Sequence, residues 1–304
     1  MKSNLTLEQF EILTFIERNQ DKKITQRNLS DEFDVSLGKI NKIMDELIQL
    51  ELIKILNNSK YTVTLKGYEW LEPYRVKKAI FMAAGFGSRM VPVTLNTPKP
   101  LIKVHGKRII ETLIDAVLNA GITDITIVRG YLGEQFDLLL KKYPMIKFVE
   151  NPIYNESNNI SSAYAIRDML ANAYVLESDL VLYNEDIIRK YEYSTNYLGM
   201  QVDRTDDWCF ETKKGHITKV KVGGENVYHM FGISYWTKED ALKMQKDIAK
   251  VFNMPGGKER YWDEVALKEC IDNYDVLVRP VHRGDIVEID TYNELKQIDS
   301  IYNV

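Results

Sequence analysis

Short apolar runs alternate with longer amphipathic segments from Lys77 onward. The short runs predict strands, and the longer segments carry apolar residues at helical spacing. Up to Asp179 the segments alternate strictly between the two kinds, as "KAIFMAA", "RIIETLIDAVLNAG", "ITDITIVRGY", "GEQFDLLLKKY", "IKFVEN", "NISSAYAIRDML" and "AYVLESD". Strands joined by helices of this length predict right-handed crossover units and a parallel sheet.

The alternation is looser after Asp179. The strand-like segments there are "YLGMQV", "ITKVKVG", "NVYHMFGISYW" and "VLVRPV". They are interleaved with predicted helices around "EDALKMQKDIAKVF" and "ERYWDEVALKECI", and "TYNELKQIDSIY" is the last helix. This part of the chain therefore extends the α/β domain.

The residues before Pro73 have a different pattern. "LTLEQFEILTFIER", "ITQRNLSDEF" and "SLGKINKIMDELIQLELI" predict three helices, with Thr25 and Ser36 as N-caps of the second and third. "IKILNNSKYTVT" predicts a hairpin around a polar turn, and "LKGYEWLEPY" closes the segment. We therefore expect two domains, a small α+β domain over residues 1–74 and an α/β domain over 75–304.

Composition narrows the class of protein. The 304 residues are 45% hydrophobic and 28% charged, as in soluble globular proteins, and no apolar run is long enough to span a bilayer. Acidic residues near the N-terminus argue against a signal peptide. Two cysteines without metal-ligand spacing fit a reducing compartment. We expect a cytoplasmic protein without a membrane partner, and the net charge of −4 gives no general attraction to nucleic acid.

A glycine-containing loop, "MAAGFGSRM", directly follows the strand "KAIFMAA". Glycines at a strand end let the backbone approach a phosphate, but the loop fits neither the P-loop nor the complete Rossmann fingerprint. Two cations strengthen the evidence for phosphate binding. Arg89 comes at the end of the loop, and Lys99 lies between two prolines that stiffen its backbone. Loop amides together with Arg89 and Lys99 predict a polyphosphate cradle.

The segments "AAGFGSRM" and "TPKPLIKVHGKRII" resemble the signature of the nucleotidyltransferase superfamily. Several later segments are most similar to the bacterial CTP:phosphocholine cytidylyltransferases, among them "GYLGEQF", "YNESNNISSAY", "LESDLVL", "DDWCFE", "RYWDEVA" and "IVEIDT". The resemblance implies a Rossmann-like nucleotidyltransferase domain with a mixed, mainly parallel sheet. It also implies an enzyme that transfers CMP from CTP to phosphocholine and releases pyrophosphate.

The resemblance also implies roles for residues of the loop and of a later helix start. Lys99 and Arg89 are the expected catalytic cations. Asn158 and Asn159 open a predicted helix, where they contact the ribose or base or only cap that helix. The expected nucleotide-binding residues are Ala83, Ala84, Gly85, Phe86, Gly87, Ser88, Asn158 and Asn159.

Two aspartates are candidate metal ligands. Nucleotidyl transfer builds charge on phosphate oxygens, and Mg²⁺, which binds carboxylates and phosphates, is suited to offset it. Asp179 ends the strand "YVLESD" and Asp290 ends "VEID", and the resemblance places the family's metal-binding aspartates on the same two residues. The alternative for each is a helix N-cap, and Asp290 directly precedes the last predicted helix.

Aromatic and acidic residues in the second half suit a cationic acceptor. A quaternary ammonium donates no hydrogen bond and is held by aromatic faces and a nearby carboxylate. Trp208 follows two aspartates, Tyr261 precedes Trp262 and Asp263, and the resemblance assigns the ammonium cage to Trp208 and Tyr261. We expect Trp208, Tyr261 and Asp263 to bind phosphocholine, with Trp262 in the core as the alternative.

The first domain resembles the winged helix-turn-helix domains of bacterial regulators. Lys39 and Lys42 on its third helix and the "NNSK" turn are candidate DNA contacts, but up to Arg75 there are 11 Lys and Arg against 12 Asp and Glu. DNA binding and a protein-contact or dimerisation role, hence a homo-oligomer, both stay open. Two other functions also stay open: a sugar-1-phosphate nucleotidylyltransferase and a transcriptional regulator that only senses a ligand. Arg108 and "NNISSA" depart from the sugar-type pattern.

Overall fold

The computed structural model describes residues 4–56 and 60–303, which divide between Arg75 and Val76 into two compact units, unit 1 before this boundary and unit 2 after it. Unit 1 contains the helices α1 (Leu7–Arg18), α2 (Gln26–Phe33), α3 (Leu37–Gln49) and α4 (Leu65–Leu71) and the antiparallel hairpin of β1 (Ile53–Leu56) and β2 (Lys60–Val63). Thr25 caps α2 through its side chain, whereas Ser36 stands at the N-cap of α3 without a side-chain bond. The predicted turn at residues 57–59 lies outside the described residues.

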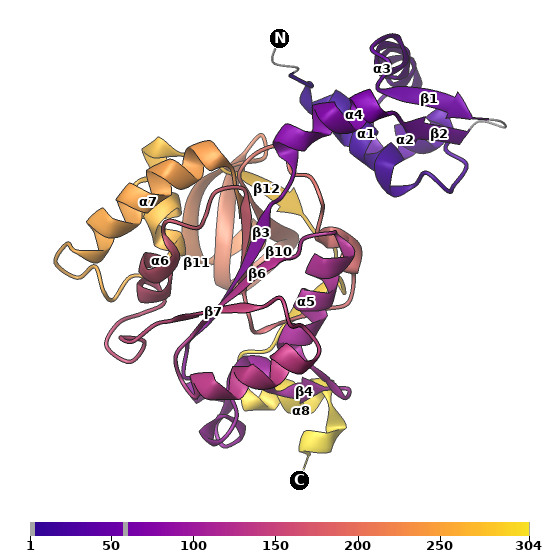
Figure 1. The fold of residues 1–304 in the computed structure, drawn as a ribbon. Coiled ribbons are helices and arrows are strands. Elements are labelled where there is room, and N and C mark those ends of the chain that lie inside the picture. Colours follow the sequence, from indigo (N-terminus) through magenta and orange to yellow (C-terminus); the bar gives the residue numbers. More distant parts are fainter. Residues whose placement is uncertain (1–3, 57–59, 304) are drawn as a thin grey trace. The chain divides into compact units, whose positions relative to one another are not determined.

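Unit 2 is built on a seven-stranded mixed sheet in the order β10, β12, β11, β8, β3, β6, β7 (Figure 1). The strands β3, β6, β7 and β8 pair in parallel, as do β10 and β12, while β11 runs antiparallel to its neighbours β8, β10 and β12. The sheet strands are β3 (Lys78–Ala83), β6 (Asp124–Arg129), β7 (Lys147–Glu150), β8 (Ala173–Glu177), β10 (Asn196–Lys213), β11 (His216–Trp236) and β12 (Leu277–Pro280). The prediction of a mixed, mainly parallel sheet is therefore confirmed.

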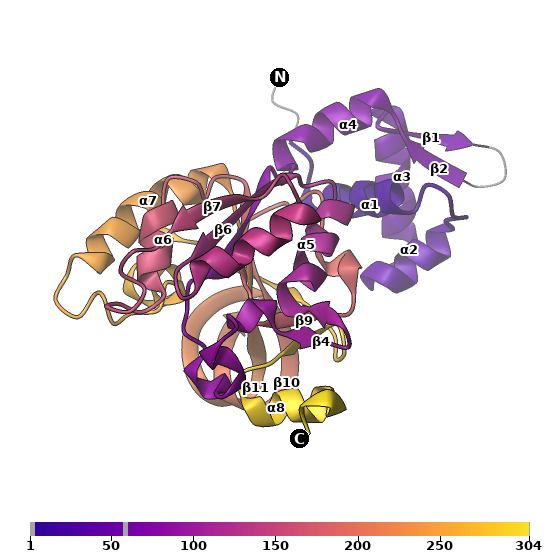
Figure 2. The same cartoon turned by 60° about the horizontal axis from the view of Figure 1, so that its bottom comes forward.

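Helices cover both faces of this sheet because successive side chains of β3 point to opposite sides. Phe81 packs in one core with α5 (Ile109–Asn119), whereas Ile80 packs in another with α6 (Ile160–Ile166) and α7 (Lys238–Phe252). The two views show α6 and α7 together on one side and α5 on the other (Figures 1 and 2). The carboxyl ends of β3 and β8 are therefore held between the two apolar cores that pack on the opposite faces of the sheet.

Two predicted helices have other forms. The segment Gly133–Lys141 is a 3₁₀ helix. In "ERYWDEVALKECI" the helical residues begin only at Asp263, and Val265–Glu269 form a single π turn. The N–H of Tyr261 donates to the Glu264 side chain and that of Trp262 donates to Asn159, so side chains satisfy the backbone donors at the start of this short helix. Trp262 is 1% exposed and lies in the core, the alternative considered for it.

Two short ribbons lie apart from the main sheet: β4 (Lys103–Val104) with β5 (Lys107–Arg108), and β9 (Leu180–Leu182) with β13 (Ile286–Glu288). In the second ribbon Leu180 pairs with Glu288, and the N–H of Ile289 donates to the carbonyl of Asp179 at 3.2 Å. This antiparallel pairing brings the segment before α8 (Tyr292–Ile298) next to the end of β8. No helix among the described residues is long and apolar enough to span a membrane.

Candidate active site

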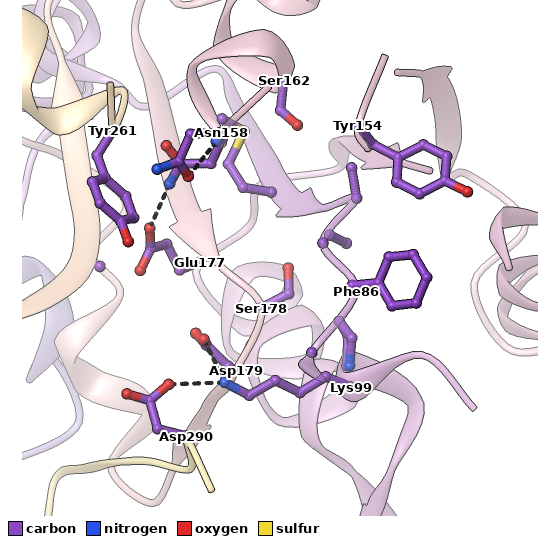
Figure 3. A pocket seen from close by; sticks show the side chains of 18 of the residues that line it. Phe86, Lys99, Tyr154, Asn158, Ser162, Glu177, Ser178, Asp179, Tyr261 and Asp290 are labelled. Atoms are coloured by element: carbon purple, nitrogen blue, oxygen red, sulfur yellow. Dashed lines mark hydrogen bonds and ion pairs between the residues drawn. The ribbon is translucent and has the colours of Figure 1, made fainter. Parts of the chain in front are cut away.

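A cavity of about 690 Å³ opens at the carboxyl ends of β3 and β8 (Figure 3). Ligands bind at this edge in open α/β sheets. The structure places every predicted site residue on its wall, although the first and the last of them, Ala83 and Asp290, lie more than two hundred positions apart in the sequence. These residues are Ala83, Ala84, Gly85, Phe86, Gly87, Ser88, Arg89, Lys99, Asn158, Asn159, Asp179, Trp208, Tyr261, Asp263 and Asp290.

The glycine loop runs directly above the stem of Lys99. Gly87 has φ +63°, a conformation that L side chains rarely adopt, and a Cβ placed there would lie 3.1 Å from both Lys99 Cβ and Thr94 Cγ2. The Thr94 hydroxyl donates to the Gly87 carbonyl at 2.9 Å. The loop is therefore held close to Lys99 by a residue for which only glycine fits.

Lys99 makes the central ionic contacts of the cavity. Its Nζ lies 2.8 Å from Asp179 Oδ2 and 3.0 Å from Asp290 Oδ1, and Arg89 reaches the same Asp290 oxygen at 2.8 Å. Burial alone lowers the pKa of Lys99, but the charges and hydrogen bonds of the two aspartates outweigh burial and raise it. Lys99 is therefore a buried, fully charged ammonium between the two predicted metal ligands.

Asp290 is not a helix cap. Thr291 caps α8 through its side chain, and the backbone N–H of Asp290 itself donates to Glu294 at 2.8 Å. Asp290 lines the cavity, where Lys99 and Arg89 contact its Oδ1, and its bond to Lys99 is drawn in Figure 3. The capping alternative for this residue is wrong.

Two further acids line the cavity that the sequence analysis missed. One carboxylate oxygen each of Glu177, Asp179 and Glu288 lies within 4.8 Å of the others, a grouping able to hold a metal ion. Burial raises the pKa of Glu177 well above its usual range, helped by Asp263, Asp179 and Glu288. Burial also raises that of Glu288, helped by Asp179 and Asp290. The repeated Glu-x-Asp spacing in "ESD" and "EID" was the signal available in the sequence.

The acceptor wall combines two rings with a buried acid. The rings of Trp208 and Tyr261 meet edge to face with centroids 5.5 Å apart. Asp263, 6% exposed, accepts a hydrogen bond of 2.6 Å from the Tyr197 hydroxyl. Burial raises the pKa of Asp263 to about 7, against the opposing effect of that hydrogen bond.

The two asparagines join this wall to the sheet. Asn159 donates to Glu177 Oε1 at 3.3 Å and accepts from the Trp262 N–H at 2.8 Å, while Asn158 donates to the carbonyl of Glu259 at 3.2 Å. Neither side chain caps α6, although Asn159 stands at its N-cap position. Their side chains therefore hold the segment with Tyr261 in place beside β8.

The comparisons with known proteins agree with this geometry. The nucleotidyl transferase family matches residues 78–205. A 2-aminoethylphosphonate cytidylyltransferase of Lancefieldella rimae is 39% identical over 74% of this chain and 92% of its own. A choline-phosphate cytidylyltransferase of Streptococcus pneumoniae is 33% identical over 74% of this chain and 97% of its own. The solved structure of the CTP:phosphocholine cytidylyltransferase from that species superposes with a TM-score of 0.69 at 33% identity, over 75% of this chain and 99% of the other.

The chain belongs to the cytidylyltransferases of the nucleotidyl transferase family. As a cytidylyltransferase it uses CTP and a substrate that carries a phosphate-type group, and it is an enzyme rather than only a ligand sensor. About three quarters of this cytidylyltransferase align with almost the whole length of these relatives. The remaining quarter of the chain is not matched by them.

Aromatic rings also border the cytidylyltransferase cavity opposite Tyr261. Phe86, 53% exposed on the glycine loop, faces the cavity near Tyr154, with ring centroids 6.4 Å apart (Figure 3). Behind it, Phe86 stacks on Tyr131 with centroids 4.1 Å apart. Gly130 permits this arrangement, because a Cβ there would lie 2.7 Å from the Tyr154 ring. The sequence analysis assigned Phe86 to nucleotide binding but did not foresee its two ring neighbours.

Proposed function

We propose that this cytidylyltransferase transfers CMP from CTP to phosphocholine, releasing CDP-choline and pyrophosphate. The observation that carries this proposal is the pair of rings, Trp208 and Tyr261, in the same cavity as the buried Asp263, Lys99 and the glycine loop. Aromatic faces attract a quaternary ammonium, and nearby carboxylates offset its charge. The 33% identity to a choline-phosphate cytidylyltransferase supports it.

The reaction is an in-line displacement at the α-phosphorus of CTP. A phosphate oxygen of the acceptor forms the new P–O bond, and the bond to the β-phosphate breaks with its electron pair leaving on pyrophosphate. Lys99, Arg89 and the loop amides offset the charge that develops on the phosphates. No covalent intermediate with the protein is needed.

Asp179 and Asp290 are the residues we propose for holding Mg²⁺, with Glu177 and Glu288 beside them. The donor set fits, because Asp179 Oδ1 is buried without a hydrogen-bond partner and one carboxylate oxygen of Asp179 lies close to those of Glu177 and Glu288. When bound, the ion supplies positive charge next to the phosphate oxygens. The chain supplies the carboxylates, and the ribbon of β9 and β13 holds them together.

A second acceptor, 2-aminoethylphosphonate, is favoured by a specific observation. A primary ammonium donates hydrogen bonds and therefore needs acceptors, and Glu177 and Asp263 provide carboxylates beside the rings. Among the described residues, no Lys or Arg forms an ion pair with either of them. The 39% identity to a 2-aminoethylphosphonate cytidylyltransferase points the same way.

The test is a pyrophosphate-release panel that crosses the common nucleoside triphosphates with phosphocholine, phosphoethanolamine, 2-aminoethylphosphonate and sugar 1-phosphates. The highest kcat/KM for CTP with phosphocholine supports the first proposal, and the highest value with 2-aminoethylphosphonate replaces it by the second. Tyr261→Leu should raise the KM of the preferred acceptor. Tyr183→Leu is the matched control, since Tyr183 is similarly exposed but does not line the cavity.

For unit 1 we propose that it contacts DNA. The proposal rests only on the sequence in which its helices and its hairpin follow one another along the chain. Its helix α3 carries Lys39 and Lys42, but Lys39 pairs with Glu8, and Lys42 lies 4.0 Å from Glu46. Lysines that are already paired with carboxylates contribute little to the binding of DNA phosphates. A gel shift with the promoter of its own operon should weaken as salt rises, and no shift at low salt refutes the proposal in favour of a protein-contact role.

A further inference from the structure

Lys99 occupies the position between the two proposed metal ligands. Its ammonium contacts Asp179 Oδ2 and Asp290 Oδ1 at 2.8 and 3.0 Å, and only 8% of the residue is exposed (Figure 3). A surface lysine exchanges its partners with water readily, but this one is enclosed by the loop above it and the carboxylates in front of it. The contact is therefore a defined state of the site.

This ammonium and a divalent cation compete for the same negative charge. Both are attracted to Asp179 and Asp290, and they repel each other at the short separations that the two carboxylates impose. Arg89 adds a second positive charge on Asp290 Oδ1 at 2.8 Å. In this state the two aspartates are already neutralised by side chains of the chain itself.

The nucleotide offers Lys99 another partner. Gly87 lies directly over the lysine stem, with its ideal Cβ position 3.1 Å from Lys99 Cβ, so phosphates bound to the loop amides lie within reach of the same flexible side chain. A triphosphate carries several negative oxygens in that space, and an ammonium binds phosphate as a point charge. Movement of the Lys99 head toward the phosphates frees the facing oxygens of Asp179 and Asp290.

We propose that Lys99 holds the place of the divalent cation: its ammonium neutralises Asp179 and Asp290 until the triphosphate draws it away, so that the metal binds with or after CTP and not before. The proposal rests on the metal site of the proposed function. It makes the free enzyme a poor metal binder and couples metal affinity to nucleotide binding, and by linkage the coupling is reciprocal.

The test is Mn²⁺ binding to the full-length protein without nucleotide, followed by the electron paramagnetic resonance signal of free Mn²⁺. Lys99→Met should bind Mn²⁺ about 10-fold tighter than the wild type, because the competing charge is gone. Lys99→Arg retains the charge and should stay close to the wild type. Lys103→Met is the matched control for loss of one positive charge, since Lys103 is exposed on β4 and does not line the cavity.

Equal Mn²⁺ affinity of Lys99→Met and the wild type overturns the inference but leaves the metal site standing. No Mn²⁺ binding by any variant, with or without CTP, overturns the metal site and the inference with it. A measurement on the wild type covers the case in which Lys99→Met fails to fold. With lysine side chains labelled with ¹⁵N, the Lys99 resonance should shift on adding CTP in EDTA and stay in place on adding Mg²⁺ alone. A shift with Mg²⁺ alone contradicts the inference.

Discussion

Asp263→Asn should stabilise the metal-free protein at alkaline pH more than at acidic pH. Asp263 is almost fully buried, and burial raises its pKa to about 7. Because the folded protein keeps a proton that the unfolded chain has already released, the free energy of unfolding falls as pH rises from about 4 to about 7. Asparagine has no such charge to bury and still accepts the hydrogen bond from Tyr197.

The magnitude follows from the two pKa values. A change of one unit corresponds to about 1.4 kcal/mol, so the step from the usual value of 3.8 to about 7 amounts to roughly 4 kcal/mol once Asp263 is fully ionised. Part of this destabilisation is already present at about pH 5, above the unfolded-state pKa. The gain from Asp263→Asn should therefore be roughly 2–3 kcal/mol larger at about pH 8 than at about pH 5.

Urea unfolding in EDTA, followed by tryptophan fluorescence, measures this difference. Three of the four tryptophans, Trp208, Trp236 and Trp262, report on unit 2. The wild type and Asp263→Asn are compared at both pH values, with Asp203→Asn as an exposed control. An equal gain at the two pH values refutes the reasoning, because a change in packing alone does not depend on pH. If Asp263 binds the acceptor, the stabilised variant should also show a higher acceptor KM.

Four further outcomes are expected. Asp179→Asn should lower kcat/KM by about 10³-fold while circular dichroism stays unchanged, and normal turnover would remove the metal assignment. Trp208→Leu should raise the KM of the acceptor about 2- to 30-fold with the KM of CTP unaffected, and an equal effect on both substrates argues against the cage. Gly87→Ala should lower stability by about 1–2 kcal/mol and weaken CTP binding, whereas Gly85→Ala, whose added Cβ meets no protein atom within 4 Å, should leave stability unchanged; an equal loss of stability in the two variants contradicts the role of the +63° φ angle. A chain that begins at Val76 should fold and keep its turnover in the pyrophosphate assay, since relatives of that extent are named as enzymes; loss of turnover would show that unit 1 contributes to the site.

The local pattern predicted the parallel strands of the sheet, whereas its mixed character and the aromatic pair of the cavity came from the resemblance to a known family. Strand ends identified Asp179, and the loop and its two cations stand close together in the sequence, so their meeting required no knowledge of distant contacts. Asp290 was also proposed from the sequence, but the sequence did not show why it lies close to Asp179. The pairing of β9 with β13 joins segments about a hundred residues apart, and no local pattern specifies that partner.

Two acids of the cavity, Glu177 and Glu288, were not predicted from the sequence, because tertiary contacts bring them to the site. Glu177 and Glu288 stand in strand segments, where an acid is ordinarily solvent-exposed, and only the folded chain shows that both are partly buried on the cavity wall. The bonds that the side chains of Asn158 and Asn159 make to the segment 259–262 were likewise not foreseen, because no local pattern specifies that partner. Both residues also line the cavity, and their contact with the nucleotide stays a prediction.

The ribbon of β9 and β13 has a consequence for how substitutions in this protein are interpreted. Only three residue pairs align it, from Ile286 with Leu182 to Glu288 with Leu180, and Val181 anchors it in a small apolar cluster together with Ile289 and Leu295. Trimming Val181 or Ile289 would shift one aspartate relative to the other without touching any reacting group. A random screen for inactive variants should therefore recover aliphatic positions in this ribbon, and their loss of turnover would reflect a misaligned pair of acids rather than missing chemistry.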